Sequence, residues 1–89
     1  MVDVEDENTS IRVKNMNGDY IDYNFGRNAG LIYKRNIYNA AKSLKTFPYR
    51  CVKKNGLYKL ITRSGYLYYD VYESNKTVYI YEIFPASKN

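Results

Sequence analysis

Histidine is absent from this chain, and cysteine occurs once, at Cys51. These two shortages exclude disulfide frameworks, zinc-finger spacings, Ser-His and Cys-His nucleophile pairs, and histidine general bases. Any catalysis therefore has to use lysine, arginine, tyrosine or carboxylate groups. Cys51 is interpreted as a small apolar residue beside a strand rather than a reactive thiol. Phosphate loops, dinucleotide fingerprints and clusters of metal ligands are also missing, so no cofactor and no metal are predicted.

Long apolar runs are missing as well. No run approaches the roughly 18 consecutive apolar residues that mark a membrane span. Residues 1–7 are acidic where a secretory signal is basic and then apolar. We therefore expect a soluble, cytoplasmic protein with no membrane partner. Its 89 residues fit a single domain, residues 1–89, around one core.

Positive charge dominates the body of the chain. Fourteen lysine and arginine residues against nine acids give a net charge of +5, and four of the nine acids lie in the first seven residues. Residues 8–89 thus carry 14 cations against 5 acids, a net charge of +9. A field of this sign attracts nucleic acid or an acidic protein partner, and it does not choose between them.

The stretch from Leu57 to Phe84 is expected to organise the fold. It contains three runs dense in β-branched and aromatic residues, separated by polar turns at 63–65 and 73–76, which predicts a three-stranded antiparallel meander. Seven of the twelve tyrosines lie in it. The period of two assigns alternate side chains to the core, namely Leu67, Tyr69 and Val71. The intervening side chains belong to a half-exposed face, namely Tyr66, Tyr68, Asp70 and Tyr72.

Two templates fit residues 11–26. Alternation from Ile11, the turn signal Asn17-Gly18 and a return run over 20–25 favour a β-hairpin. Apolar residues at roughly helical spacing fit a helix instead, although Gly18 would cost that helix about 1 kcal/mol. Residues 1–10 are either a frayed leader or a short first strand.

A helix is predicted over residues 28–45. Its apolar stripe falls at steps of three and four and consists of Ala29, Tyr33, Ile37, Ala40, Ala41 and Leu44. Asn28 is the expected N-cap, and the helix should be over by Pro48, whose ring cannot continue it.

Cations and tyrosines are interleaved after this helix. The set that we expect to form a binding surface is Arg50, Lys53, Lys54, Lys59, Arg63, Tyr66, Tyr68 and Tyr72. Such a set suits an RNA strand, because cations meet phosphates while rings stack on bases. The alternative is a solvated basic rim beside tyrosines that cover the sheet.

Several short sequence segments resemble those of the RelE/ParE toxin superfamily, the plasmid-stabilisation-like toxins of type II toxin–antitoxin pairs. They are Tyr20-Ile21, Asn24-Phe25-Gly26, Ala40-Ala41-Lys42-Ser43-Leu44-Lys45-Thr46-Phe47-Pro48-Tyr49-Arg50, Leu57-Tyr58-Lys59-Leu60, Gly65-Tyr66-Leu67-Tyr68-Tyr69-Asp70-Val71 and Asn75-Lys76-Thr77-Val78-Tyr79-Ile80. The resemblance spans about Tyr20 to Phe84. It implies an α+β fold, with a helix or helical hairpin packed on a twisted antiparallel sheet of three to four strands. In that arrangement residues 11–24 belong to the first helix, and Val2 to Val4 form the first strand.

The resemblance also implies a function. A toxin of this superfamily inhibits an essential host process, either DNA gyrase or translation through ribosome-dependent mRNA cleavage, and a cognate acidic antitoxin neutralises it. The family's nuclease set is depleted here, because Tyr66 stands at its arginine position and Pro85 stands where a histidine is common. The candidates that remain for catalysis are Lys53, Lys54, Lys59, Arg63 and Tyr66. We favour an inhibitor that acts by binding; the alternative is a non-toxic binding module, for example a phage or mobile-element inhibitor of a host enzyme.

Overall fold

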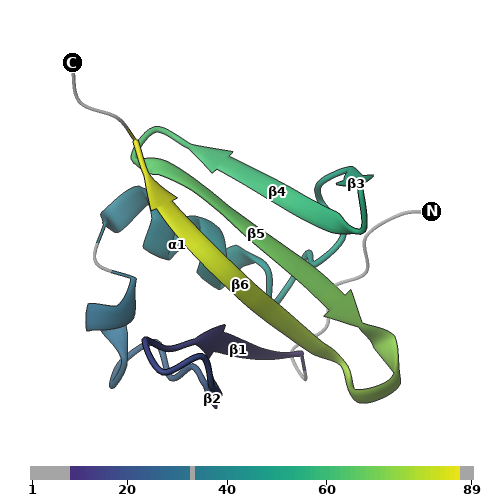
Figure 1. The fold of residues 1–89 in the computed structure, drawn as a ribbon, viewed down its shortest axis with the longest axis horizontal. Helices are drawn as coiled ribbons and strands as arrows, with labels where there is room; N and C mark the ends of the chain where they lie inside the picture. Colours follow the sequence, from purple (N-terminus) through teal and green to yellow (C-terminus); the bar gives the residue numbers. More distant parts are fainter. Residues whose placement is uncertain (1–8, 33, 87–89) are drawn as a thin grey trace.

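The computed structural model describes residues 9–32 and 34–86, which form one six-stranded mixed sheet with the order β2-β1-β6-β5-β4-β3 (Figure 1). The strands are β1 (Ser10–Lys14), β2 (Tyr20–Asp22), β3 (Lys53–Lys54), β4 (Leu57–Thr62), β5 (Gly65–Tyr72) and β6 (Thr77–Pro85). One α-helix and two 3-10 turns accompany them, namely α1 (Arg35–Ser43), η1 (Ala29–Leu31) and η2 (Glu73–Asn75). Helix α1 lies behind the sheet in Figure 1 and packs against β4 and β5. Neither α1 nor the 3-10 turns among these described residues have the length and apolar character needed to cross a bilayer.

The predicted fold class is wrong. It required a helix or helical hairpin on an antiparallel sheet of three to four strands, whereas the sheet has six strands and β1 runs parallel to β6. The reason lies in residues 10–22, where the RelE/ParE resemblance implied a first helix. Ile11 and Val13 are buried on one side of β1 and alternate with polar residues, so the period is that of a strand.

The hairpin interpretation of this segment is therefore the correct one. Strand β1 pairs antiparallel with β2, in the register Arg12↔Asp22 and Lys14↔Tyr20. The turn is wider than Asn17-Gly18 alone. The Asn15 side-chain oxygen accepts hydrogen bonds from the backbone N–H groups of Asn17 at 2.9 Å and Asp19 at 3.0 Å, which closes the loop locally. The predicted first strand at Val2 to Val4 lies outside the described residues.

The predicted helix is shorter than expected at its start. Residues 29–31 form η1, and α1 begins only at Arg35. Asn28 is not its N-cap, because the Asn28 side-chain oxygen accepts from the Asn24 N–H at 2.8 Å and stabilises the preceding turn instead. The end agrees with the expectation, since the helix stops at Ser43, ahead of Pro48. Its inward face follows the predicted stripe, with Ile37 and Ala41 buried; Tyr33 is not among the described residues.

The meander over residues 57–84 is confirmed. Strands β4, β5 and β6 pair antiparallel in sequence order, with a bulge beside Tyr68 and Tyr69. Leu67 and Tyr69 are fully buried against α1, as the period of two predicts. This side of the sheet holds most of the core. Each fully buried large side chain there contributes about 1.5–3 kcal/mol of hydrophobic stabilisation. The opposite side, which we call the open face, is not covered by any helix of the described residues.

Candidate functional site

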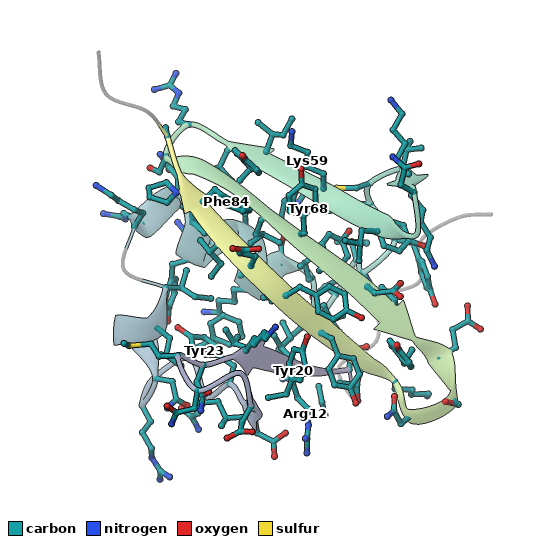
Figure 2. The ribbon with its side chains drawn as sticks, in the orientation of Figure 1. Arg12, Tyr20, Tyr23, Lys59, Tyr68 and Phe84 are labelled. Carbon is teal, nitrogen blue, oxygen red and sulfur yellow. The ribbon has the colours of Figure 1, made fainter. Side chains whose placement is uncertain are left out.

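The open face carries most of the aromatic side chains of the sheet. Figure 2 looks onto it and labels Tyr20, Tyr68 and Phe84 there. Because side chains alternate between the two sides of a strand, the neighbours of the buried core residues lie on this face. Its aromatic members are Tyr20, Tyr66, Tyr68, Tyr72, Tyr79, Tyr81 and Phe84. Six of them are half-buried, and Tyr72 is 46% exposed.

At one end of the face, three rings form a cluster that we call the lysine-capped cluster. The Tyr66 and Phe84 rings stack across β5 and β6 with centroids 5.0 Å apart. Tyr68 meets both edge-on, at 5.7 Å and 5.9 Å. The Lys59 ammonium lies 4.4 Å from the centroid of Tyr66 and 5.8 Å from that of Tyr68. A cation over aromatic rings is attracted by their negative faces, so Lys59 has a defined position above the cluster.

At the other end, four rings form a second cluster. Tyr79 meets Tyr20 at 5.3 Å and Tyr72 at 4.9 Å, and Tyr20 also meets Tyr81 at 5.8 Å. Burial, followed by the side-chain hydrogen bond with Tyr72, raises the pKa of Tyr81. Burial also raises the pKa of Tyr20. The Tyr20 and Tyr81 phenols therefore stay neutral at physiological pH, and both offer a ring and an uncharged hydroxyl group.

Two of the three acids on the open face are neutralised. Asp22 forms an ion pair with Arg12 at 2.9 Å, and Asp70 forms one with Lys53 at 3.2 Å. Glu82 is exposed, sits opposite Tyr68 in the strand register and has no cationic partner within the described part of the chain. The cations around the rings thus outnumber the acids that remain uncompensated.

The structure brings together only part of the predicted binding surface. Lys59, Tyr66 and Tyr68 make direct contacts, whereas Tyr72 belongs to the second cluster. The outer cations are spread out, since exposed Lys54 lies on the edge strand β3 and exposed Arg63 lies in the β4–β5 turn. Lys53 is engaged by Asp70.

Arg50 lies apart from this set. Its guanidinium donates to the Ser43 hydroxyl of α1 at 2.6 Å, which directs it toward the helix rather than the open face. Of the five candidates named for catalysis, Lys59 and Tyr66 are in contact with each other.

Sequence reasoning missed four aromatic members of the face, namely Tyr20, Tyr79, Tyr81 and Phe84. A signal for two of them was present, because Tyr79 and Tyr81 stand at alternate positions of β6. Phe84 is out of this alternation and reaches the face through the register shift at the bulge. Tyr20 had no such signal. It reaches the face only because β1 pairs with β6, a contact between distant parts of the chain.

A second charged surface covers the helical side. Residues 24–52, which we call the helix layer, contain six cations and no acid: Arg27, Lys34, Arg35, Lys42, Lys45 and Arg50. The sequence signal was available here too, since no acid occurs anywhere between Tyr23 and Tyr69. A shallow hollow at the end of α1 is lined by side chains that include Lys42, Lys45 and Thr46. The protein is thus strongly basic behind the sheet and aromatic in front of it.

No group of three histidine, cysteine or acidic side chains within the described ranges could hold a metal ion. No protein-family model matches the chain, and no curated protein or solved structure matches it either. The geometry of the open face and the charge of the helix layer are therefore the features that indicate a function.

Proposed function

We propose that the protein is a binding module for single-stranded nucleic acid, with the open face as its binding surface. The observation that carries the proposal is the lysine-capped cluster, in which Lys59 lies 4.4 Å from the ring of Tyr66 on a sheet face that no described helix covers. Bases stack on aromatic rings while lysines contact the phosphates between them. An aromatic sheet face presents both kinds of group on the same side of the sheet.

The energetics fit this ligand. Base stacking on an aromatic side chain contributes about 1–3 kcal/mol per base, so two or three bases on this face would give useful affinity. The rings are already held by edge-to-face contacts with one another, which lowers the entropy lost on binding. The net positive charge of residues 8–89 attracts a polyanion from any direction, and the open face supplies the rings on which its bases stack.

The test compares two lysines of the same charge. Binding of a fluorescently labelled oligouridine and of its DNA counterpart would be followed by anisotropy over a series of salt concentrations. We expect Lys59→Gln to lower the salt slope by about 1, as removal of one phosphate contact does, and Tyr68→Leu to weaken binding about 5-fold to 100-fold at constant charge. Lys42→Gln on the helix layer is the matched control and should change affinity less.

An equal loss from Lys42→Gln and Lys59→Gln, with no effect of Tyr68→Leu, would contradict the proposal. That result would mean that the helix layer binds the polyanion by charge alone. Circular dichroism of each variant separates a loss of binding from a loss of folding.

The RelE/ParE resemblance suggests a narrower form of the same proposal, a cytoplasmic toxin that acts on translation and is neutralised by an acidic antitoxin. Messenger RNA is single-stranded, so the same face would meet it, and the acid-free helix layer suits an acidic protein. This form stays a prediction, as does inhibition of gyrase. Residues 11–24, which the resemblance assigned to a first helix, contain strand pairing between β1 and β2 instead. Induced expression in a bacterium, with mapping of mRNA 5′ ends, tests it: arrest with new cuts supports a nuclease, and normal growth contradicts toxicity.

A further inference from the structure

The C-terminal half of strand β6 pairs with another strand on one side only. Strand β1 pairs only with residues 77–80 of β6, whereas β5 pairs with β6 as far as Pro85. Residues 81–85 therefore have an edge without a neighbouring strand among the described residues, and Figure 1 shows β1 beside only the lower half of β6. An unpaired edge of this kind is a template for another strand.

The backbone groups at this edge can be assigned from the register. The Ala86 N–H donates to the Ser64 carbonyl oxygen at 2.7 Å, which makes Ser64 and Ala86 a hydrogen-bonded pair. Pairs alternate along an antiparallel ladder, so the N–H and C=O of Ile83, opposite Leu67, point away from β5. Pro85 has no N–H, which limits pairing beyond it. The edge thus presents a donor and an acceptor at Ile83 to an incoming chain.

A hollow lies directly beside the same edge. Its lining includes Val13 and Met16 from the β1–β2 hairpin, Leu31 from η1 and Ile83 itself. Met16 is fully exposed at 101% and Leu31 is 37% exposed, so two large apolar side chains that border the hollow are open to solvent, Met16 fully and Leu31 in part. Exposed apolar groups beside an unpaired strand edge mark an interaction site more strongly than either feature alone.

We propose that an extended peptide segment of a protein partner adds to β6 at Ile83 as a further strand and places an apolar side chain in the hollow between Met16 and Leu31. The backbone dictates this choice of ligand, because an extended peptide presents donors and acceptors at the spacing of a strand edge. The side chain that enters the hollow is expected to be apolar, because Met16 and Leu31 border it. A nucleic acid offers neither feature, so this ligand differs from the one proposed for the open face, although Tyr81 and Glu82 of that face also border the hollow.

The experiment uses the whole chain and a synthetic peptide of known sequence. A library of linear peptides would be displayed and selected on the protein, and the best peptide would be made with its normal backbone and with alternate amides N-methylated. N-methylation removes backbone donors and keeps the side chains. We expect the methylated peptide to bind about tenfold or more weakly, as the loss of backbone hydrogen bonds predicts. In the isotope-labelled protein, amide shifts should concentrate at Ile83, Met16 and Leu31.

A double variant, Met16→Asn with Leu31→Asn, removes both apolar side chains without changing the net charge, and it keeps the fold testable because both side chains are exposed. It should lose peptide binding about tenfold while binding the oligouridine as before, so failure here and failure of the nucleic-acid proposal are distinguishable. The proposal is overturned if the methylated peptide binds as well as the parent, if the amide shifts lie at the lysine-capped cluster instead, or if the double variant selects and binds the same peptides equally.

Discussion

The Tyr69 hydroxyl donates a hydrogen bond to the Pro48 carbonyl oxygen at 3.0 Å, inside the core. Tyr69 is fully buried on β5, and Pro48 follows the end of α1, so this bond attaches the helix layer to the sheet. The Tyr69 ring also stacks on Tyr58 with centroids 5.0 Å apart. Tyr69 thereby joins the helix layer to the sheet by a hydrogen bond as well as by apolar packing.

Removing this hydroxyl should have a measurable cost. Tyr69→Phe keeps the ring and leaves the Pro48 carbonyl without its partner, and we expect a loss of about 1–3 kcal/mol in the free energy of unfolding, measured by urea titration. Tyr66→Phe is the control, because the Tyr66 hydroxyl has no hydrogen bond to the described residues, and it should change stability by less than about 0.5 kcal/mol. Equal stabilities for Tyr69→Phe and the parent protein would show that water or another group satisfies the carbonyl.

Gly65 begins β5 in a conformation that other residues avoid, with φ at +148°. A Cβ at this position would collide with the Phe84 carbonyl oxygen and lie 2.8 Å from the Pro85 Cα, both backbone atoms of β6. Gly65→Ala should therefore destabilise the protein by about 2–4 kcal/mol. At Gly30, where a Cβ meets nothing within 4 Å, the same substitution should be neutral or stabilising by up to about 1 kcal/mol. Thermal unfolding of the two alanine variants side by side checks the contrast, which disappears if the backbone at Gly65 and at the end of β6 shifts apart freely.

Glu82 is the one uncompensated acid that the described residues place on the open face. If phosphates pass beside Tyr68, removal of this charge should strengthen nucleic-acid binding, by about twofold to fivefold for Glu82→Gln at low salt. Asp19→Asn makes the same change of charge in the β1–β2 turn and should have a smaller effect. Anisotropy with the labelled oligouridine measures both, and a larger gain from Asp19→Asn would place the ligand elsewhere.

Stability should fall in alkaline solution. Burial, followed by the hydrogen bond to Glu73, raises the pKa of Tyr49, and burial likewise raises that of Tyr69 and Tyr81. In the unfolded chain these phenols have their ordinary pKa of about 10, so they lose protons there first and pull the equilibrium toward unfolding. Their contribution is complete below pH 10 and declines as the pH rises above it. Urea midpoints at about pH 8 and pH 11 test this, and Tyr49→Phe should make the decline less steep.

The sequence predicted the local elements better than their assembly. The meander follows from alternation and turn residues, both of which act over a few positions, and the β1–β2 hairpin follows from the same signals. The fold class failed because the strings shared with RelE/ParE toxins lie mainly in the meander and near α1, which are compatible with more than one arrangement. Nothing local indicates that β1 pairs with β6.

For the candidate site too, contacts between neighbouring strands could be predicted from the sequence, whereas contacts between distant parts of the chain could not. Lys59, Tyr66 and Tyr68 lie on adjacent strands of one local meander, so their proximity could be foreseen. Arg50 could not be assigned correctly from spacing, because the length of the connection after α1 does not reveal that its guanidinium turns back to Ser43. The second cluster depends on Tyr20, whose position requires the pairing of distant strands.

The parallel pairing of β1 with β6 has a kinetic consequence. Ser10 lies beside Thr77, so most of the described chain forms a loop that must close before these two strands meet. Closing so long a loop costs more entropy than closing the short loop of a hairpin. Proteins rich in such distant contacts fold slowly. We expect the meander and the β1–β2 hairpin to form early and their union to limit the folding rate. The second aromatic cluster would then be the last part of the surface to assemble.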